Sequence, residues 1–339
     1  MERDSNRLWI LKGLSIFSVV CAHVAYDSTQ NLQEQVALNL LNNFGTIGVV
    51  VFFVLAGYFF SKKNEDAGIF WTKKVKHLVL PWLICGSLVY LHCFQLYNIH
   101  HWYGWYEENI KNFDPLMYMG YILGTNSLYY YMTMLFCCFI IFRLLRHYEK
   151  ITILITVFSL LFLAFLGEKF TIAGTPYLNP GNWLGYFGCG VILRKSQEQV
   201  YDYIRKIKWL GVVASFIGVS LLFGMSNYGF VINYFHRLFI PFVFLQMMVL
   251  LNFSLWIEKY TKVIRNILIR LGKDSYYIYL LHMLMQTVPV KYLSNRGWGC
   301  IILRPIVLIV LTELIILIFR LTASLITQLY FYYKKIRLR

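Results

Sequence analysis

Long apolar runs constrain this chain more than any other feature of its sequence. Segments of about 20 apolar residues, the length that crosses a bilayer as a helix, recur along almost all of it. Hydrophobic residues make up 58% of the chain and charged residues only 14%, whereas a soluble domain averages roughly 25% charged residues. Backbone polar groups find no water inside a bilayer, so such runs must form helices. The sequence therefore predicts a polytopic, all-α membrane helical bundle.

Ten of these runs are predicted to be transmembrane helices. A further apolar stretch, residues 116–124, is short and is expected to dip into the membrane without crossing it. The ten predicted spans cover residues 8–26, 44–60, 77–97, 127–145, 151–167, 182–194, 207–225, 237–256, 275–290 and 300–332.

The distribution of positive charge orients these spans. Ten crossings place both termini on one side, and 25 of the 32 Lys and Arg residues fall on that side. The opposite loops hold only Lys111, Lys169, Lys291 and Arg296. Because cytoplasmic loops are enriched in Lys and Arg, both termini are expected in the cytoplasm. The net charge of +16 then reflects membrane orientation, and no nucleic-acid partner is predicted.

The chain is expected to be one membrane domain over residues 1–339, without an appended soluble domain, because no linker or low-complexity tract interrupts the spans. The aromatic residues of the longest outward loop, about 98–115, could stack on sugar rings or anchor the loop at the interface. The seven cysteines form no CxxC pair, and His92, His100 and His101 lack convincing ligand spacing. Neither a disulfide framework nor a metal site is predicted.

Two polar side chains interrupt the first span. Lys12 and His23, in ILKGLSIFSVVCAHV, are eleven residues apart, which places them on nearly the same helix face and ~16 Å apart along its axis. Such groups at membrane depth usually face a cavity or a partner. We expect them to line one continuous shaft, with Lys12 near the cytoplasmic mouth. Alternatively, Lys12 reaches to the headgroups and His23 bonds a neighbouring helix.

A cation and a deeper imidazole suit a long ligand with a phosphate head and a reactive tail. Acyl-coenzyme A has that shape, since its phosphates and its thioester lie at opposite ends of a flexible arm. The basic end would bind phosphate, and a neutral imidazole could take a proton from an attacking hydroxyl. Gly13 would allow close approach beside Lys12, and Ser15 lies one turn away toward the same side.

Other polar residues permit two interpretations each. Asp27 follows His23 by four residues and could orient the imidazole, or it is a solvated loop carboxylate. His282 could line the same cavity or be a satisfied buried histidine. Glu313 interrupts the last span and is expected either to form an ion pair or to face water, while Arg304 begins that span.

A basic cluster precedes the sequence LVLPW. It consists of Lys73, Lys74 and Lys76, which could bind coenzyme A phosphates or could anchor the span by the positive-inside rule. Arg237, in YFHRLFIP, could likewise contact an acceptor or the outer headgroups.

Five motifs, in family order, resemble the acyltransferase-3 superfamily of membrane acyltransferases. KGLSIFSVVCAH (12–23) is similar to its first-helix signature, a basic residue and glycine followed by a histidine eleven positions after the basic residue. The lysine version of this signature resembles the branch that includes fucose 4-O-acetylase-like proteins. The other matches are GTIGVVVFFVLAGYFFSKK (45–63), WTKKVKHLVLPWL (71–83), NWLGYFGCGVILRK (182–195) and LGKDSYYIYLLHMLM (271–285).

This resemblance implies a membrane O-acyltransferase, usually an O-acetyltransferase, in the bacterial cytoplasmic membrane. The implied donor is cytoplasmic acetyl-CoA, without a metal, and the implied acceptor is a hydroxyl of a cell-surface glycan or its lipid-linked precursor. His23 is the leading catalytic candidate. Lys12 and the cluster at 73–76 are implied as donor-phosphate ligands, with His282 and Tyr279 as further pocket residues. Many members carry arginine where this chain has Lys12, and lysine binds phosphate as a point charge.

A transporter or flippase for a glycan or lipid-linked intermediate is the main alternative. In that case His23, His282 and Glu313 would form a proton relay or a polar lining. The pairing of Lys12 with His23 on one helix suits a thioester donor better, and the sequence shows no inverted repeat with paired broken helices. A membrane module that serves a separate enzyme is a third interpretation.

Overall fold

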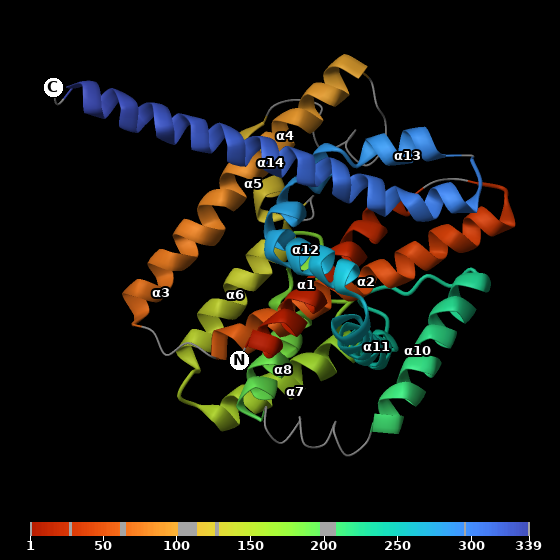
Figure 1. Cartoon of the computed structure of the whole chain (residues 1–339). Coiled ribbons are helices and arrows are strands. Elements are labelled where there is room, and N and C mark those ends of the chain that lie inside the picture. The colour runs from red at the N-terminus through yellow and green to blue at the C-terminus, as the bar shows by residue number, and fades with distance from the viewer. Residues whose placement is uncertain are drawn as a thin grey trace.

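The computed structural model of the chain describes residues 2–26, 29–61, 66–100, 114–125, 129–196, 208–294 and 296–337. Apart from one isolated bridge between Ile172 and Thr175, every regular element in these residues is a helix, which confirms the predicted all-α class (Figure 1). The α-helices are α1 (Glu2–Val24), α2 (Leu32–Ser61), α3 (Ala67–Lys74), α4 (Leu80–His100), α5 (Pro115–Leu123), α6 (Tyr130–Leu144), α7 (Glu149–Leu166), α8 (Leu184–Lys195), α10 (Lys208–Asn227), α11 (Phe239–Tyr260), α12 (Lys262–Leu281), α13 (Thr287–Leu293) and α14 (Trp298–Arg337). A π-helix, η1 (Val75–Val79), joins α3 to α4, and short 3₁₀ turns are η2 (Pro176–Leu178), η3 (Pro180–Asn182) and η4 (His282–Leu284).

Six stretches of helix in the described chain are long and apolar enough to cross a membrane. They lie in α1, α2, the continuous α3–η1–α4 segment, α7, α11 and α14, while α6 and α10 contain shorter apolar helices. These helices follow the predicted spans in order, and the chain is a multi-pass membrane protein. The count of ten crossings stays a prediction. Helix α5 has nine residues, about 14 Å of length, which is too short to cross.

The predicted span at 275–290 is wrong. Helix α12 begins at Lys262 and ends at Leu281, and the chain then passes through η4 before α13. Hydropathy did not reveal the first half of α12 because Lys262, Arg265 and Arg270 are interspersed there with apolar residues. His282 therefore lies at a helix break, where its side chain is fully buried.

Helix α2 also begins earlier than predicted, at Leu32 instead of residue 44. Its added turns carry Asn43, a fully buried polar residue. The Asn43 Nδ2 donates to Ser226 Oγ at 3.2 Å and to Phe230 O at 2.9 Å. Because these bonds satisfy the amide inside the protein, this part of α2 tolerates a polar residue that breaks the apolar pattern.

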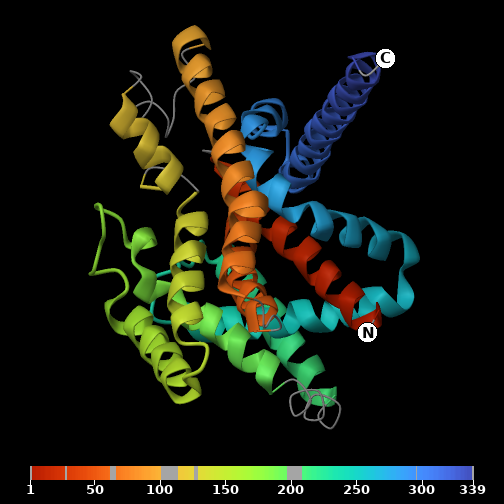
Figure 2. The ribbon, with the colours of Figure 1, turned by 90° about the vertical axis from the view of Figure 1, so that its left-hand side faces the viewer.

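Helix α1 lies in the centre of the bundle and contacts α2, α11, α12 and α14 (Figures 1 and 2). Its contact with α12 is close because each helix places a glycine against the other's backbone. A Cβ at Gly13 would lie 2.2 Å from Leu268 O, and one at Gly272 would lie 2.1 Å from Trp9 O. Small residues of this kind allow membrane helices to pack backbone to backbone. The packing fixes the side of α1 that carries Lys12.

A second reciprocal pair of glycines joins α2 to α8. A Cβ at Gly57 would lie 2.0 Å from Phe187 O, and one at Gly190 would lie 1.9 Å from Val54 O. The start of α1 and the end of α14 lie toward the same side of the bundle, on the left of Figure 1. This arrangement agrees with an even number of crossings, and the cytoplasmic identity of that side remains a prediction.

Candidate active site

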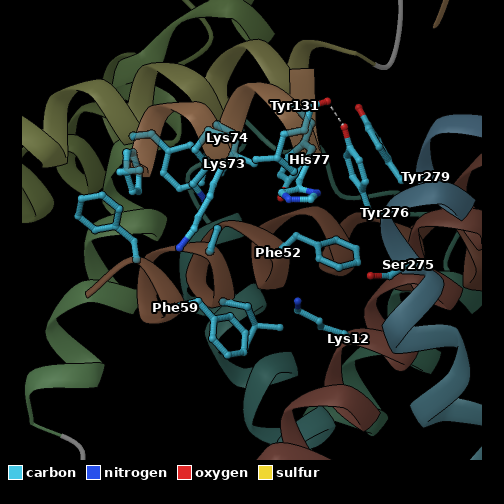
Figure 3. Close-up of a pocket in the computed structure, with 17 residues that line it drawn as sticks. Lys12, Phe52, Phe59, Lys73, Lys74, His77, Tyr131, Ser275, Tyr276 and Tyr279 are labelled. Carbon is cyan, nitrogen blue, oxygen red and sulfur yellow. Dashed lines mark hydrogen bonds between the residues drawn. The ribbon is translucent and has the colours of Figure 1, made fainter. Parts of the chain in front are cut away.

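The first of two cavities lies beside the N-terminal half of α1. This lysine cavity has a volume of about 520 Å³ and receives the basic side chains of Lys12, Lys73, Lys74 and His77. Figure 3 shows Lys12 entering from one side and the other three from the opposite side. Its walls are largely aromatic, and its remaining lining residues are Phe52, Leu55, Ala56, Phe59, Phe60, Phe70, Leu78, Tyr131, Leu135, Phe139, Ser275, Tyr276 and Tyr279.

Local structure around α3 presents its basic residues to this cavity. Asp66 caps α3 by accepting a hydrogen bond from Gly68 N at 2.8 Å, and the helix continues into the π-helix η1. Such π turns inside α-helices are frequent at functional sites. Lys73 and His77, four residues apart, both line the cavity, with Lys74 between them. The Nζ of Lys74 lies 3.8 Å from the ring centroid of Phe139, a cation–π contact.

The charged groups in the described lining of the lysine cavity are all basic. No Asp or Glu occurs among the described residues that line it. Lys12 is partly buried, and its Nζ lies 4.8 Å from the ring centroids of both Trp9 and Phe59. Within the described chain no carboxylate is within ion-pair distance of Lys12. A cavity that receives several cationic side chains is suited to a polyanionic ligand.

The second cavity lies at the C-terminal end of α1. This tyrosine cavity has a volume of about 420 Å³ and contains His23. Among the described residues, no Lys, Arg, Asp or Glu lines it. Its polar lining consists of uncharged groups, the phenols of Tyr130, Tyr131, Tyr177, Tyr234 and Tyr279 together with Asn42, Thr46, Thr125 and Thr175.

Two buried tyrosines, Tyr131 and Tyr279, line both cavities. Their ring centroids are 5.3 Å apart and the rings meet edge to face. The expected continuous shaft is therefore two cavities that meet at this tyrosine pair. Lys12 faces one cavity and His23 faces the other, on the same side of α1, and a ligand that reached from one to the other would have to pass Tyr131 and Tyr279.

His23 has a second histidine beside it. The ring centroids of His23 and His282 are 5.0 Å apart. The Nδ1 of His282 lies 3.0 Å from Ile278 O and 2.9 Å from Tyr279 O. Because carbonyl oxygens only accept hydrogen bonds, Nδ1 carries the proton and Nε2 has a free lone pair. That Nε2 is buried and has no hydrogen-bond partner in the described part of the molecule.

Hydrogen bonds from the last helices hold the end of α1. The Nε2 of Gln286 donates to His23 O at 2.7 Å. The fully buried Arg304 bonds Ser294 Oγ at 3.0 Å and lies 3.4 Å from Val24 O. These contacts fix the backbone that carries His23 against α13 and α14.

Comparison with known proteins identifies the family of this chain. The acyltransferase-3 family model, described as an acyltransferase domain, matches residues 6–328, almost the whole chain. The chain belongs to the acyltransferase-3 family. It is therefore a membrane acyltransferase. No curated protein and no solved structure matches it.

Not every predicted residue of this acyltransferase lies at a cavity. Ser15 is fully buried, its Oγ donates to Leu11 O at 2.7 Å, and it is not among the residues that line either cavity. Lys76 is exposed and lies outside the lining of both cavities. Asp27 lies outside the described residues. Glu313 forms an ion pair with Arg270 at 3.2 Å, which is one of the two arrangements expected for it from the sequence.

Several lining residues of the acyltransferase were not singled out from sequence. His77 follows the basic cluster by one residue, and the run YYY at 129–131 supplies two tyrosines of the second cavity. Two more of its five tyrosines, Tyr177 in η2 and Tyr234 in the turn before α11, come from segments that are distant in sequence. Repeated tyrosines beside a predicted helix start were the available signal, whereas nothing in the sequence relates Tyr177 to Tyr234.

Proposed function

We propose that this acyltransferase is a membrane O-acetyltransferase. It moves the acetyl group of acetyl-CoA, bound from the cytoplasm, to a hydroxyl of a cell-surface glycan or its lipid-linked precursor. The observation that supports this proposal most strongly is the meeting of a cationic cavity with an uncharged, hydroxyl-rich cavity that contains His23.

The lysine cavity suits the donor. Coenzyme A carries phosphates at one end, and Lys12, Lys73 and Lys74 bring ammonium groups to the cavity that can contact them. The aromatic walls, which include Phe59 and Phe139, offer apolar contact to the adenine ring and the flexible arm. With the phosphates held near Lys12, the arm points along α1 toward the Tyr131–Tyr279 pair.

The tyrosine cavity suits an uncharged sugar. Phenol, amide and hydroxyl groups can both donate and accept hydrogen bonds, as sugar hydroxyls do. Tyrosine rings also offer flat apolar faces to the C–H faces of a sugar. The ring centroids of Tyr130 and Tyr177 in its wall are 4.7 Å apart. The ring of Trp183 packs beside Tyr130, with centroids 5.5 Å apart, so these lining tyrosines belong to a larger aromatic cluster.

His23 acts as the general base in this proposal. Its imidazole takes the proton of the acceptor hydroxyl as that oxygen forms a bond to the acetyl carbon. The carbon–sulfur bond then breaks, and the coenzyme thiolate leaves and takes up the proton held by His23, which restores the neutral imidazole. The acetyl ester remains on the sugar. Direct transfer and a covalent acetyl-His23 intermediate are both compatible with this arrangement.

His282 assists His23 as a neutral neighbour. Its proton lies on Nδ1, toward two carbonyl oxygens, so the lone pair on Nε2 is available to the imidazolium that forms at His23. A buried acceptor without a partner is costly, and such cost is tolerated where it serves a reaction.

The test is acetyl transfer by purified protein reconstituted in lipid vesicles. We expect His23→Ala to lose at least about 100-fold in the rate of acetyl transfer, since general base catalysis contributes 10²–10⁴-fold. His147→Ala is the matched control, because His147 is exposed on the turn after α6 and lines neither cavity. Transfer by His23→Ala at the rate of the control would refute the assigned chemistry.

The acceptor is found by a second experiment. Deletion of the gene should remove one acetyl mass from a surface glycan, measured by mass spectrometry of released glycans. Complementation with the His147→Ala variant should restore that mass, and complementation with His23→Ala should not. Loss of the entire glycan from the surface, instead of loss of its acetyl group, would favour the transporter alternative.

A further inference from the structure

A third cavity lies on the face of α12 that is turned away from α1. It has a volume of about 400 Å³ and lies between α12 and α14. We call it the arginine groove, and it is lined by Asn266, Ile269, Arg270, Lys273, Asp274 and Arg320. Because α12 reaches the lysine cavity through Ser275, Tyr276 and Tyr279, the groove is separate from the site described above.

The groove presents positive charge to its outside. Arg320 holds Asp274 with both guanidinium nitrogens, at 2.5 and 3.1 Å, and Arg270 bonds Glu313 at 3.2 Å. The arginine side chains are 65% (Arg270) and 52% (Arg320) exposed, whereas the carboxylates are only 13% (Glu313) and 9% (Asp274) exposed. The carboxylates therefore lie beneath the arginines. Lys273 is exposed as well, which gives these five groups a net charge of +1.

The groove lies at the depth of lipid headgroups. Helix α14 begins at Trp298, an exposed aromatic residue of the kind found at membrane interfaces. Arg320 follows it by 22 residues, ~33 Å along the helix, and the hydrocarbon core of a bilayer is ~30 Å thick. A helical stretch of that length reaches from one interface to the other, so Arg320 lies near the interface opposite Trp298.

The surface around the groove is apolar. Leu317, Ile318, Phe319 and Leu321 flank Arg320 on α14 and are all exposed. In a membrane helix such residues contact acyl chains. A ligand of the groove therefore meets cations and a hydrocarbon surface together, as an amphiphile with an anionic head does.

From these observations we infer that the arginine groove binds the phosphate headgroup of an anionic phospholipid. Basic pockets between membrane helices on the cytoplasmic side are suited to such headgroups. Guanidinium groups bind phosphate through paired N–H donors, and the side chains of Arg270 and Arg320 remain more than half exposed although each also holds a carboxylate. A phosphodiester with one negative charge neutralises the net charge of +1.

The test is native mass spectrometry of the full chain released from nanodiscs of equal phosphatidylglycerol and phosphatidylcholine. We expect preferential retention of phosphatidylglycerol by the wild type. Lys273→Gln should lower that preference about fivefold, the effect of one basic group near an anionic headgroup, and Lys273→Arg should retain it. Lys262→Gln is the matched control, because Lys262 is an exposed lysine at the start of the same helix and outside the groove.

Three results would overturn the inference. The first is equal retention of the two lipids by the wild type. The second is an equal loss of preference in Lys262→Gln and Lys273→Gln, which would mean a diffuse surface charge. The third is release of phosphatidylglycerol by millimolar inorganic phosphate, which would mean a site for a soluble anion. None of these measurements depends on acetyl transfer, so the lipid site and the proposed enzymatic function are tested separately.

Discussion

Replacement of Lys12 by methionine tests the donor site most sharply. Methionine keeps an unbranched apolar side chain beside Trp9 and Phe59 and removes only the ammonium group. A hydrogen bond between charged groups contributes about 1.5–3 kcal/mol. No carboxylate of the described chain competes for Lys12, so the phosphate of a donor would receive most of that interaction. The KM for acetyl-CoA should therefore rise about 10- to 100-fold.

The same variant should leave kcat nearly unchanged. Lys12 is ~16 Å from His23 along α1, so its contact with the donor is the same in the ground state and in the transition state. The assay measures release of the free thiol with acetyl-CoA and with acetyl-pantetheine, a donor that lacks the phosphates. Lys12→Met should show a raised KM with acetyl-CoA and an unchanged KM with acetyl-pantetheine. Comparing wild type and variant with both donors isolates the lysine–phosphate interaction.

Equal impairment with both donors would refute the assignment of Lys12 to phosphate. Protein stability provides the control, because removal of a partly buried cation without an acidic partner should not destabilise the fold. A lowered unfolding midpoint of Lys12→Met would show instead that its ammonium group stabilises the bundle.

Three further variants test other parts of the account. His282→Gln should lower kcat about 10- to 100-fold without changing either KM, measured with the reconstituted protein; an unchanged kcat would exclude support of His23 by His282. Ser15→Ala should leave every kinetic constant within about twofold, because its hydroxyl bonds Leu11 O inside α1; a raised KM for acetyl-CoA would show that the hydroxyl reaches the donor. Gly190→Leu should lower the thermal unfolding midpoint sharply, because a Cβ there would lie 1.9 Å from Val54 O; an unchanged midpoint would show that α2 and α8 do not require this contact.

Hydropathy predicted most of the helices because the bilayer requires long apolar segments. It failed where polar residues are satisfied inside the protein. Asn43 bonds α10 and the following loop, so α2 extends beyond its apolar part. Arg270 and Asp274, near the middle of α12, form ion pairs with α14, so this segment is helical although it is charged. These partners are distant in sequence and cannot be inferred from local composition.

The candidate site was predictable only where one helix sets the geometry. Lys12 and His23 both line cavities on the same side of α1, as their eleven-residue spacing in a helix predicted. Ser15 was assigned to the same side but is buried within the helix packing. The division of the expected shaft depends on Tyr131 and Tyr279, which come from α6 and α12. Sequence spacing within one helix carries no information about a residue contributed by another.

The most direct measurement is a cryo-electron microscopy structure of the full chain with a non-transferable acetyl-CoA analogue. The account predicts phosphate density near Lys12 in the lysine cavity. It also predicts that the arm passes between Tyr131 and Tyr279 and presents its acyl group to His23 in the tyrosine cavity. An analogue bound elsewhere, or an arm that ends in the lysine cavity with the tyrosine pair closed and the acyl group out of reach of His23, would contradict it.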